Sequence, residues 1–210
     1  MTQPKLVVCE HPLLKHKLAH LRDKRTPPSD FRRLMHEAGA ILGYEALREM
    51  GCKKISVPTP IRTSPAEVLA EPVALVAVLR AGLGLMEGVL SLYPEARVGH
   101  IGLYRNEETL NPVRYYVRLP KDLNKSFVVL CDPMLATGGS AAEALRILKM
   151  DGAKKIALVS LLAAKDGVRR VHQDHPDVAI YTAAVDAKLN AVGYIVPGLG
   201  DAGDRLFGTF

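Results

Sequence analysis

Apolar residues along the chain gather in short unbroken runs, separated by stretches with helical spacing. The clearest runs are residues 72–79, 127–130 and 156–162. Strands that are buried on both faces of a parallel sheet show this continuous pattern. Similar but less regular runs at 97–104 and 178–185 predict two further strands.

A helix is predicted before the first strand, at residues 29–50, and a second follows the loop at Gly82 and Gly84 and ends at about residue 92. Two further helices are predicted at residues 141–150 and 167–174. Ser29 follows two prolines and is predicted to cap the first helix. Ser140 and Glu143 have the spacing of a capping box at the start of the third. Because strands alternate with helices, we predict an α/β fold: a doubly wound, mainly parallel sheet flanked by helices.

The ends of the chain and one internal segment do not follow this alternation. Residues 111–119 alternate apolar and polar side chains, which predicts the return strand of a β-hairpin arm. Residues 1–55 and 186–210 are expected to form a small hood over the sheet. Since no linker or repeat interrupts the 210 residues, we expect a single domain spanning 1–210.

The composition narrows the class of partner. A formal net charge of +6 favours an anionic partner, either a nucleic acid or a polyphosphate metabolite. The three cysteines have no metal-ligand spacing and form no even set of disulfides, which fits a reducing cytoplasm. No apolar run approaches the ~20 residues of a membrane span. We therefore expect a cytoplasmic protein without a membrane partner.

The segment 127–140 carries the clearest chemical signal. A buried strand leads to Asp132, and Thr137, Gly138 and Gly139 allow a tight turn before the helix 141–150. Open amides at the start of a helix bind phosphate. An ionised acid beside them accepts hydrogen bonds from ribose hydroxyls. The segment therefore predicts a ribose-5-phosphate site.

Two arginines stand at the carboxyl ends of neighbouring predicted strands. Arg80 follows the run 72–79, and Arg105 follows 97–104. Ligands of open parallel sheets bind at this edge, so both guanidinium groups are candidates for clamping a diphosphate. The polar residues 106–111 after Arg105 are predicted to act as a lid.

Several other motifs are rejected. Residues 198–203 match GxGxxG, but only seven residues follow, too few for the βαβ unit that a dinucleotide site needs. The loop after Asp132 lacks the GxxxxGK[ST] pattern of a nucleotide-hydrolysing P-loop. His16 and His20 have no evident third metal ligand and are interpreted as surface residues. We therefore predict no residue of the protein as a direct metal ligand.

These motifs together resemble the uracil phosphoribosyltransferases, which have the type I phosphoribosyltransferase fold. The segments that carry the resemblance, in the family's order, are 11–17, 79–83, 104–109, 132–140 and 193–204. Asp132 is preceded by Cys131, whereas the usual type I loop has two adjacent acids. The single-acid form is typical of the uracil branch. Segment 61–71 departs from the family and carries no predicted site residue.

The resemblance implies that uracil and 5-phospho-α-D-ribose 1-diphosphate (PRPP) give UMP and diphosphate, with Mg²⁺ held mainly by the substrate diphosphate and water. It assigns catalytic roles to Arg105 and Asp201. It assigns PRPP binding to Arg80, Arg105, Asp132, Pro133, Met134, Leu135, Ala136, Thr137, Gly138, Gly139, Ser140 and Asp201. It assigns uracil binding to Ile195, Gly200, Asp201 and Ala202, largely through backbone groups.

Other interpretations remain open on the sequence alone. A regulator that binds RNA on the same scaffold fits the positive charge, but no basic stripe or aromatic platform supports it, so nucleic acid is not an expected partner. A transferase for a purine or for orotate is a third option, although residues 194–202 lack the cation that orotate would need. The amphipathic helix 29–50 suggests a homodimer or a higher homo-oligomer. The resemblance also raises GTP as an effector.

Overall fold

The computed structural model describes residues 5–105 and 112–209. Its main sheet has eight strands, with β8 paired to β9 beside the order β1-β10-β9-β7-β4-β5-β6. All pairings in this sheet are parallel except that of β6 with β5. The strands are β1 (Leu6–Val8), β4 (Val73–Leu79), β5 (Arg97–Arg105), β6 (Pro112–Arg118), β7 (Phe127–Cys131), β8 (Met134–Leu135), β9 (Lys155–Ala164) and β10 (Ala179–Asp186).

Helices cover both faces of this sheet. They are α1 (Pro12–Arg22), α2 (Pro28–Leu47), α3 (Gly82–Leu92), α4 (Gly139–Met150), α5 (Lys165–Asp174) and α6 (Ala202–Phe207), with a short 3₁₀ turn at Leu123–Lys125. Alternate residues of β4 point to opposite faces, as the two-residue period of a strand requires. Leu75 and Ala77 belong to the core shared with α1, α2 and α3, whereas Val76 and Val78 belong to the core shared with α4 and α5. The doubly wound α/β prediction is confirmed.

Both predicted helix caps are wrong. Helix α2 begins at Pro28, with Pro27 as a cap that makes no side-chain hydrogen bond. Proline suits the first helical position because it has no N–H to satisfy and its φ is already helical. Helix α4 begins at Gly139, capped by Gly138 with φ of 80° and without a side-chain hydrogen bond. Glu143 pairs with Arg146 instead, so it does not close back on the first turn.

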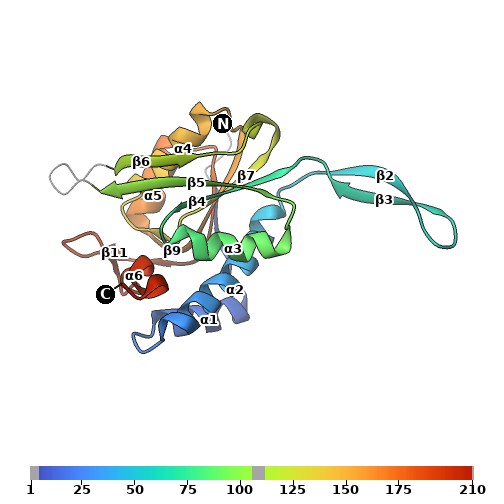
Figure 1. Cartoon of the computed structure of the whole chain (residues 1–210). Helices are drawn as coiled ribbons and strands as arrows, with labels where there is room; N and C mark the ends of the chain where they lie inside the picture. The colour runs from blue at the N-terminus through green and yellow to red at the C-terminus, as the bar shows by residue number, and fades with distance from the viewer. Residues whose placement is uncertain (1–4, 106–111, 210) are drawn as a thin grey trace.

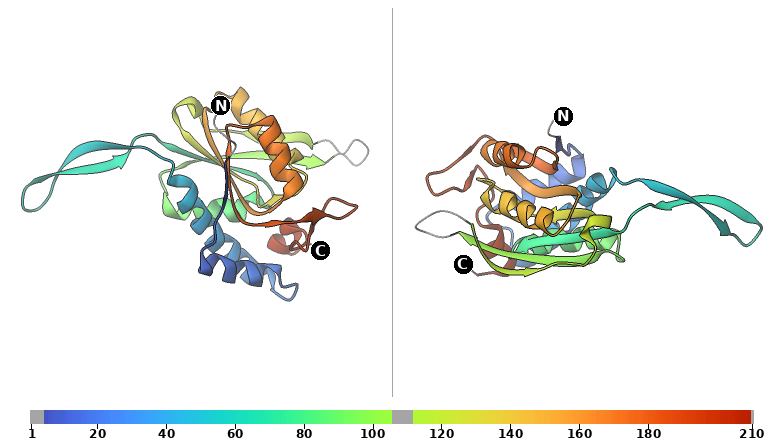
Figure 2. Two further views of the ribbon diagram at one scale, coloured as in Figure 1. Left: turned by 180° about the vertical axis from the view of Figure 1, so that it is seen from behind. Right: turned by 90° about the horizontal axis from the view of Figure 1, so that it is seen from above.

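The hairpin predicted for residues 97–119 is confirmed by the antiparallel pairing of β5 with β6 (Figure 1). A second hairpin was not predicted from the sequence. It consists of β2 (Cys52–Pro58) and β3 (Thr63–Leu69), which pair antiparallel. Figures 1 and 2 show it extending away from the sheet and helices. Ile61 at its turn is 91% exposed, so the core formed by the described residues does not cover the tip.

The two ends of the chain lie on the main body. β1 pairs with β10 as an edge strand, so part of the predicted hood 1–55 belongs to the sheet. The last residues form the small hairpin of β11 (Lys188–Leu189) and β12 (Ile195–Val196), followed by α6, which packs into the same core as α1 and α2. Over the described residues, every helix is too short or too polar to cross a lipid bilayer.

Candidate functional site

A cavity of about 290 Å³ opens at the carboxyl end of the central strands. The ends of β4, β5 and β7, the loop before α4 and the start of α6 all contribute to its wall. Its lining residues are Val78, Leu79, Arg80, Ala81, Leu103, Asp132, Pro133, Met134, Ser140, Asp201, Ala202 and Gly203. The fold thus brings together segments that are far apart in the sequence. This is the edge at which parallel α/β sheets bind ligands.

The loop between β7 and α4 encloses a smaller hollow of about 70 Å³. It is lined by Asp132 and by the residues from Met134 to Ala141. A Cβ added to Gly138 would lie 2.8 Å from the carbonyl oxygen of Gly167, and its φ is positive, so this turn requires glycine. The cap residue Gly138 has no side chain, and the Thr137 hydroxyl accepts only a long hydrogen bond of 3.5 Å from the Gly139 amide. The hollow therefore lies at the amino end of a helix whose dipole favours an anion. A hollow of this size suits one phosphate group.

The predicted phosphate residues do not all face the hollow in the same way. Asp132, Met134 and Ser140 line both cavities, while Pro133 lines only the larger one. The Leu135 side chain is 1% exposed, and its amide donates to the Ser160 hydroxyl oxygen at 3.2 Å. Leu135 therefore anchors the loop to β9, so its amide is already used.

Asp132 is the acid that lines both cavities. The residue is 9% exposed, and its backbone amide donates to the Val159 carbonyl oxygen at 3.1 Å. Burial raises the pKa of its carboxyl to about 7, although a hydrogen bond from the Met134 amide acts in the opposite direction. Such a carboxylate is poorly solvated and gains by accepting hydrogen bonds from a ligand's hydroxyl groups.

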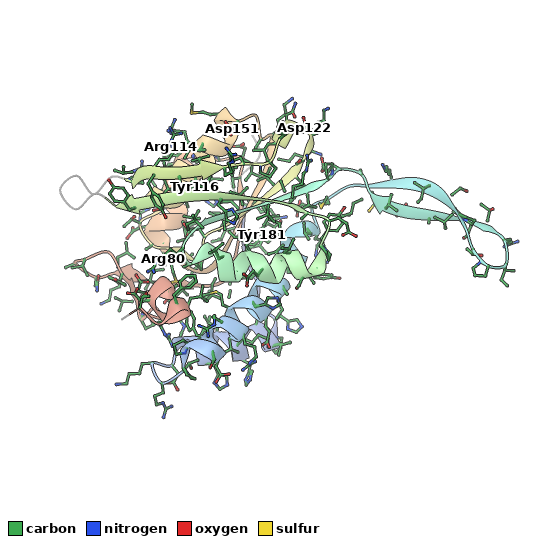
Figure 3. All side chains as sticks on the ribbon, in the orientation of Figure 1. Arg80, Arg114, Tyr116, Asp122, Asp151 and Tyr181 are labelled. Atoms are coloured by element: carbon green, nitrogen blue, oxygen red, sulfur yellow. The ribbon has the colours of Figure 1, made fainter. Side chains whose placement is uncertain are left out.

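Arg80 directly follows β4, after a cis peptide bond from Leu79. Its guanidinium lies between the start of α3 and α6 (Figure 3) and donates to Asp204 and Thr209. Its side chain is 53% exposed and lines the larger cavity, so a positive charge is available there. β5 ends at Arg105 on the same edge, but the side chain of Arg105 and the predicted lid 106–111 lie outside the described residues.

The loop before α6 forms the opposite wall. Asp201 is the N-cap of α6, and its Oδ1 accepts a hydrogen bond from the Asp204 amide at 2.9 Å. Asp201 and Ala202 line the 290 Å³ cavity, while Gly200 and Asp201 line a neighbouring cavity of about 400 Å³. Ile195 lines neither of them: its side chain is 5% exposed and belongs to the core. Of the four predicted uracil residues, three meet at this wall.

A largely buried ion pair braces this loop, and sequence reasoning missed it. Arg22 at the end of α1 makes two hydrogen bonds to Asp186, at 2.8 and 2.7 Å, and a third to the Gly198 carbonyl oxygen. The Gly198 amide donates to Asp186 at 2.9 Å. Burial acts to raise the pKa of Asp186, but the hydrogen bonds from Arg22 and Gly198 outweigh it and hold the pKa below its ordinary value. The sequence feature that could have predicted this ion pair is Asp186, an acid at the end of a buried strand.

A second buried cation completes the brace. Arg205 of α6 donates to the carbonyl oxygens of Leu21, Leu199 and Asp23, and its guanidinium lies 4.4 Å from the centre of the Phe31 ring. Carbonyl oxygens and an aromatic face together solvate a buried guanidinium. The loop at the opposite wall is therefore fixed by contacts with α1 and α2.

The donor set at the cavity offers oxygen atoms for a divalent cation. Asp132 and Asp201 are the carboxylates on its walls. Among the described residues, no three His, Cys, Asp or Glu side chains gather into a metal site. Two separated carboxylates fit a Mg²⁺ ion that keeps water and binds substrate phosphates, as this ion commonly does.

Comparisons with known proteins agree with this geometry. The family model "Uracil phosphoribosyltransferase" matches residues 7–209. The uracil phosphoribosyltransferase of Thermus thermophilus is 54% identical over 206 residues, which are 98% of this chain and 99% of the relative. The solved structure of the AQ2163 protein from Aquifex aeolicus has a TM-score of 0.93 at 41% identity, and the match covers 97% of this chain and 98% of that one.

A more distant structure shares only the fold. A hypoxanthine-guanine phosphoribosyltransferase from Bacillus anthracis has a TM-score of 0.51 at 11% identity, over 76% of this chain and 80% of that one. The predicted fold class is confirmed by these structures, and the resemblance seen in the motifs is confirmed by the family model and the relative. The chain belongs to the uracil phosphoribosyltransferase family.

Proposed function

We propose that the protein transfers the 5-phosphoribosyl group of PRPP to uracil, giving UMP and diphosphate. The observation that carries this proposal is the cavity where the loop before α4 meets the loop before α6, in a chain of this family. One loop offers a helix amino end for a phosphate, and the other offers backbone groups for a base. Pyrimidine salvage is the corresponding cellular role.

The sugar end of PRPP is assigned to the β7–α4 loop. The hollow lined by residues 136–140 takes the 5′-phosphate, and the Asp132 carboxylate accepts hydrogen bonds from the ribose hydroxyls. Arg80 and Arg105 bind the diphosphate, whose negative charge grows as the bond to the ribose breaks. Cations placed where charge develops stabilise the transition state more than the ground state.

The base is assigned to residues 195–202. Uracil presents an acceptor, a donor and an acceptor at O2, N3–H and O4, and backbone amides and a carbonyl in the loop supply the complement. Cytosine would leave a buried backbone group unpaired, at a cost of about 1–3 kcal/mol per group. Asp201 stands where the base and the ribose meet, and it faces PRPP. Ile195 contributes through its backbone, since its side chain is in the core.

Mg²⁺ is the proposed cofactor, bound mainly through the substrate diphosphate and water. When bound, it neutralises part of the charge of the diphosphate leaving group. Asp132 and Asp201 are the carboxylates that line the cavity proposed for the substrates. We expect removal of divalent cations with EDTA to abolish turnover and added Mg²⁺ to restore it.

A homodimer or a higher homo-oligomer is also proposed, with GTP as an effector to be tested. Support for self-association comes from exposed apolar side chains on α2 and on the β2–β3 hairpin, such as Tyr44 at 66% and Ile61 at 91% exposure. Light scattering after size-exclusion chromatography, with and without GTP, tests the first point, and steady-state kinetics with and without GTP test the second. A monodisperse monomer would contradict the first, and unchanged kinetics with GTP the second.

The decisive experiment measures diphosphate release with PRPP and a panel of bases. We expect turnover with uracil and at least ~10-fold lower kcat/KM with cytosine, orotate or hypoxanthine, because their edges mismatch the loop. Preference for another base would replace uracil as the substrate. Salt-dependent RNA binding without turnover would favour the alternative of an RNA-binding regulator.

A further inference from the structure

The guanidinium of Arg80 is held from behind by the carboxyl end of the chain. Its Nη2 donates to Asp204 Oδ1 at 3.2 Å, and its Nη1 donates to the Thr209 hydroxyl oxygen at 3.4 Å. That hydroxyl in turn donates to Asp204 Oδ1 at 2.8 Å. The Phe207 ring centre lies 5.5 Å from the guanidinium carbon. Three residues of one short segment therefore define where this cation stands.

Asp204 itself is fixed by its own backbone. Its amide donates to Asp201 Oδ1 at 2.9 Å, and its carbonyl oxygen accepts from the Gly208 amide at 2.7 Å. The main chain that carries the carboxylate is therefore fixed in α6, and the Thr209 hydroxyl holds the carboxylate itself. Arg80 lines the 290 Å³ cavity, whereas Asp204 does not. Asp204 lines the neighbouring 400 Å³ cavity instead, so it contacts Arg80 from outside the cavity that Arg80 lines.

We propose that Asp204, assisted by Thr209, is a positioning residue that holds the Arg80 guanidinium toward the diphosphate of PRPP. This inference rests on the proposed function, because that function assigns the diphosphate to Arg80. A guanidinium has five N–H donors, so two bonds to the segment behind it leave others for an anion. Fixing a long side chain before binding removes part of the entropy cost of ordering it at the moment of binding.

If Asp204 competed with the substrate instead of positioning Arg80, its removal would change PRPP affinity in the opposite direction. If Asp204 competed with the substrate for Arg80, its removal would free the guanidinium and tighten PRPP binding. If it positions Arg80, its removal weakens binding. Asp204→Asn retains an oxygen that accepts from Arg80 and Thr209, so a positioning role predicts that this variant stays close to wild type.

The test is steady-state kinetics with PRPP varied at saturating uracil, and then the reverse. For Asp204→Ala we expect KM for PRPP to rise about 3- to 10-fold, while KM for uracil stays within about twofold. Asp204→Asn should restore KM for PRPP to within about twofold of wild type. The matched control is Asp174→Ala on α5, an acid of similar exposure (39% against 37%) that pairs with Arg170.

A double-mutant cycle isolates the contact. Adding Asp204→Ala to Arg80→Ala should produce no further rise in KM for PRPP, because the arginine that Asp204 positions is already absent. The same variants are titrated calorimetrically with inorganic diphosphate and Mg²⁺, which tests Arg80 without requiring turnover. If wild type binds diphosphate but does not consume uracil, the proposed function fails. If Asp204→Ala leaves the binding of diphosphate and PRPP unchanged or makes it tighter, the positioning role fails. It also fails if Asp204→Ala raises KM for PRPP by the same factor in the absence of Arg80.

Discussion

Replacing Asp132 by asparagine should stabilise the protein while it impairs catalysis. Burial raises the pKa of Asp132 to about 7, from an ordinary value of 3.8, so the folded state disfavours the charged form. The unfolded chain releases this proton first, and stability therefore falls as the pH rises from about 4 to about 7. At ~1.4 kcal/mol per pKa unit, ionisation of the buried Asp132 lowers the free energy of unfolding by at most about 4 kcal/mol at pH 8 and by about 2 kcal/mol at pH 5.

The Asp132→Asn variant does not have this penalty, and its amide oxygen can still accept the hydrogen bond from Met134. We expect its melting temperature to exceed that of wild type by up to roughly 8–16 °C at pH 8, and by about half as much at pH 5. The ribose hydroxyls would meet a weaker acceptor, so kcat/KM for PRPP should fall about 10- to 100-fold.

Asp186→Asn is the matched control, because Asp186 is equally buried, at 9% exposure. Its folded pKa is lowered, so its ionised form contributes stability that is present above the unfolded pKa and is lost as the pH falls. This substitution should therefore destabilise the protein at pH 8. Melting curves of both variants from pH 5 to pH 8 check the signs. The reasoning is refuted if Asp132→Asn lowers the melting temperature at pH 8, or if its advantage does not grow with pH.

Three further substitutions test the site. Arg105→Ala should lower kcat about 100-fold or more and leave the melting temperature nearly unchanged; parallel losses of activity and stability would count against a catalytic role. Asp201→Asn should fold and lose most activity, and a near-normal rate would remove Asp201 from the site. Gly138→Ala should cost about 1–3 kcal/mol and raise KM for PRPP, because its φ is positive and a Cβ would lie 2.8 Å from a carbonyl oxygen. Gly152→Ala, at φ of 92° but with its nearest contact at 3.6 Å, should lose stability alone; equal effects on KM would contradict the role of the Gly138 turn.

The central strands were predictable because they are buried on both faces. β4, β7 and β9 consist of apolar residues almost throughout, and this pattern needs no knowledge of their neighbours. Asp132 could be placed at the site for the same reason, since it directly follows such a strand. The caps were mispredicted because serine is a common cap, whereas the actual cap of α4, Gly138, is selected by a positive φ that only the folded loop imposes.

Other features depend on partners that are distant in the sequence. β1 has only three residues and gains its identity from pairing with β10. Arg22 and Asp186 are 164 positions apart, and Arg22 alone is indistinguishable from a solvated surface arginine. The β2–β3 hairpin has no fully buried residue, since its side chains alternate only between exposed and half-buried, so its sequence lacks the continuous apolar run that reveals the central strands. The contact of Asp204 with Arg80 was hidden for the same reason as the Arg22 pair, since 124 positions separate the two residues.

The brace formed by Arg22, Asp186 and Arg205 also has a consequence for how the chain acquires its activity during synthesis. The strands and loop proposed to hold the sugar phosphate, and helix α5 whose Gly167 contacts the Gly138 turn, all precede residue 175 in the chain. The loop assigned to the base is held by groups from both ends of the chain. We therefore expect a chain truncated before residues 195–202 to lack selectivity for the base, although every segment proposed for the phosphate hollow would still be present in its sequence.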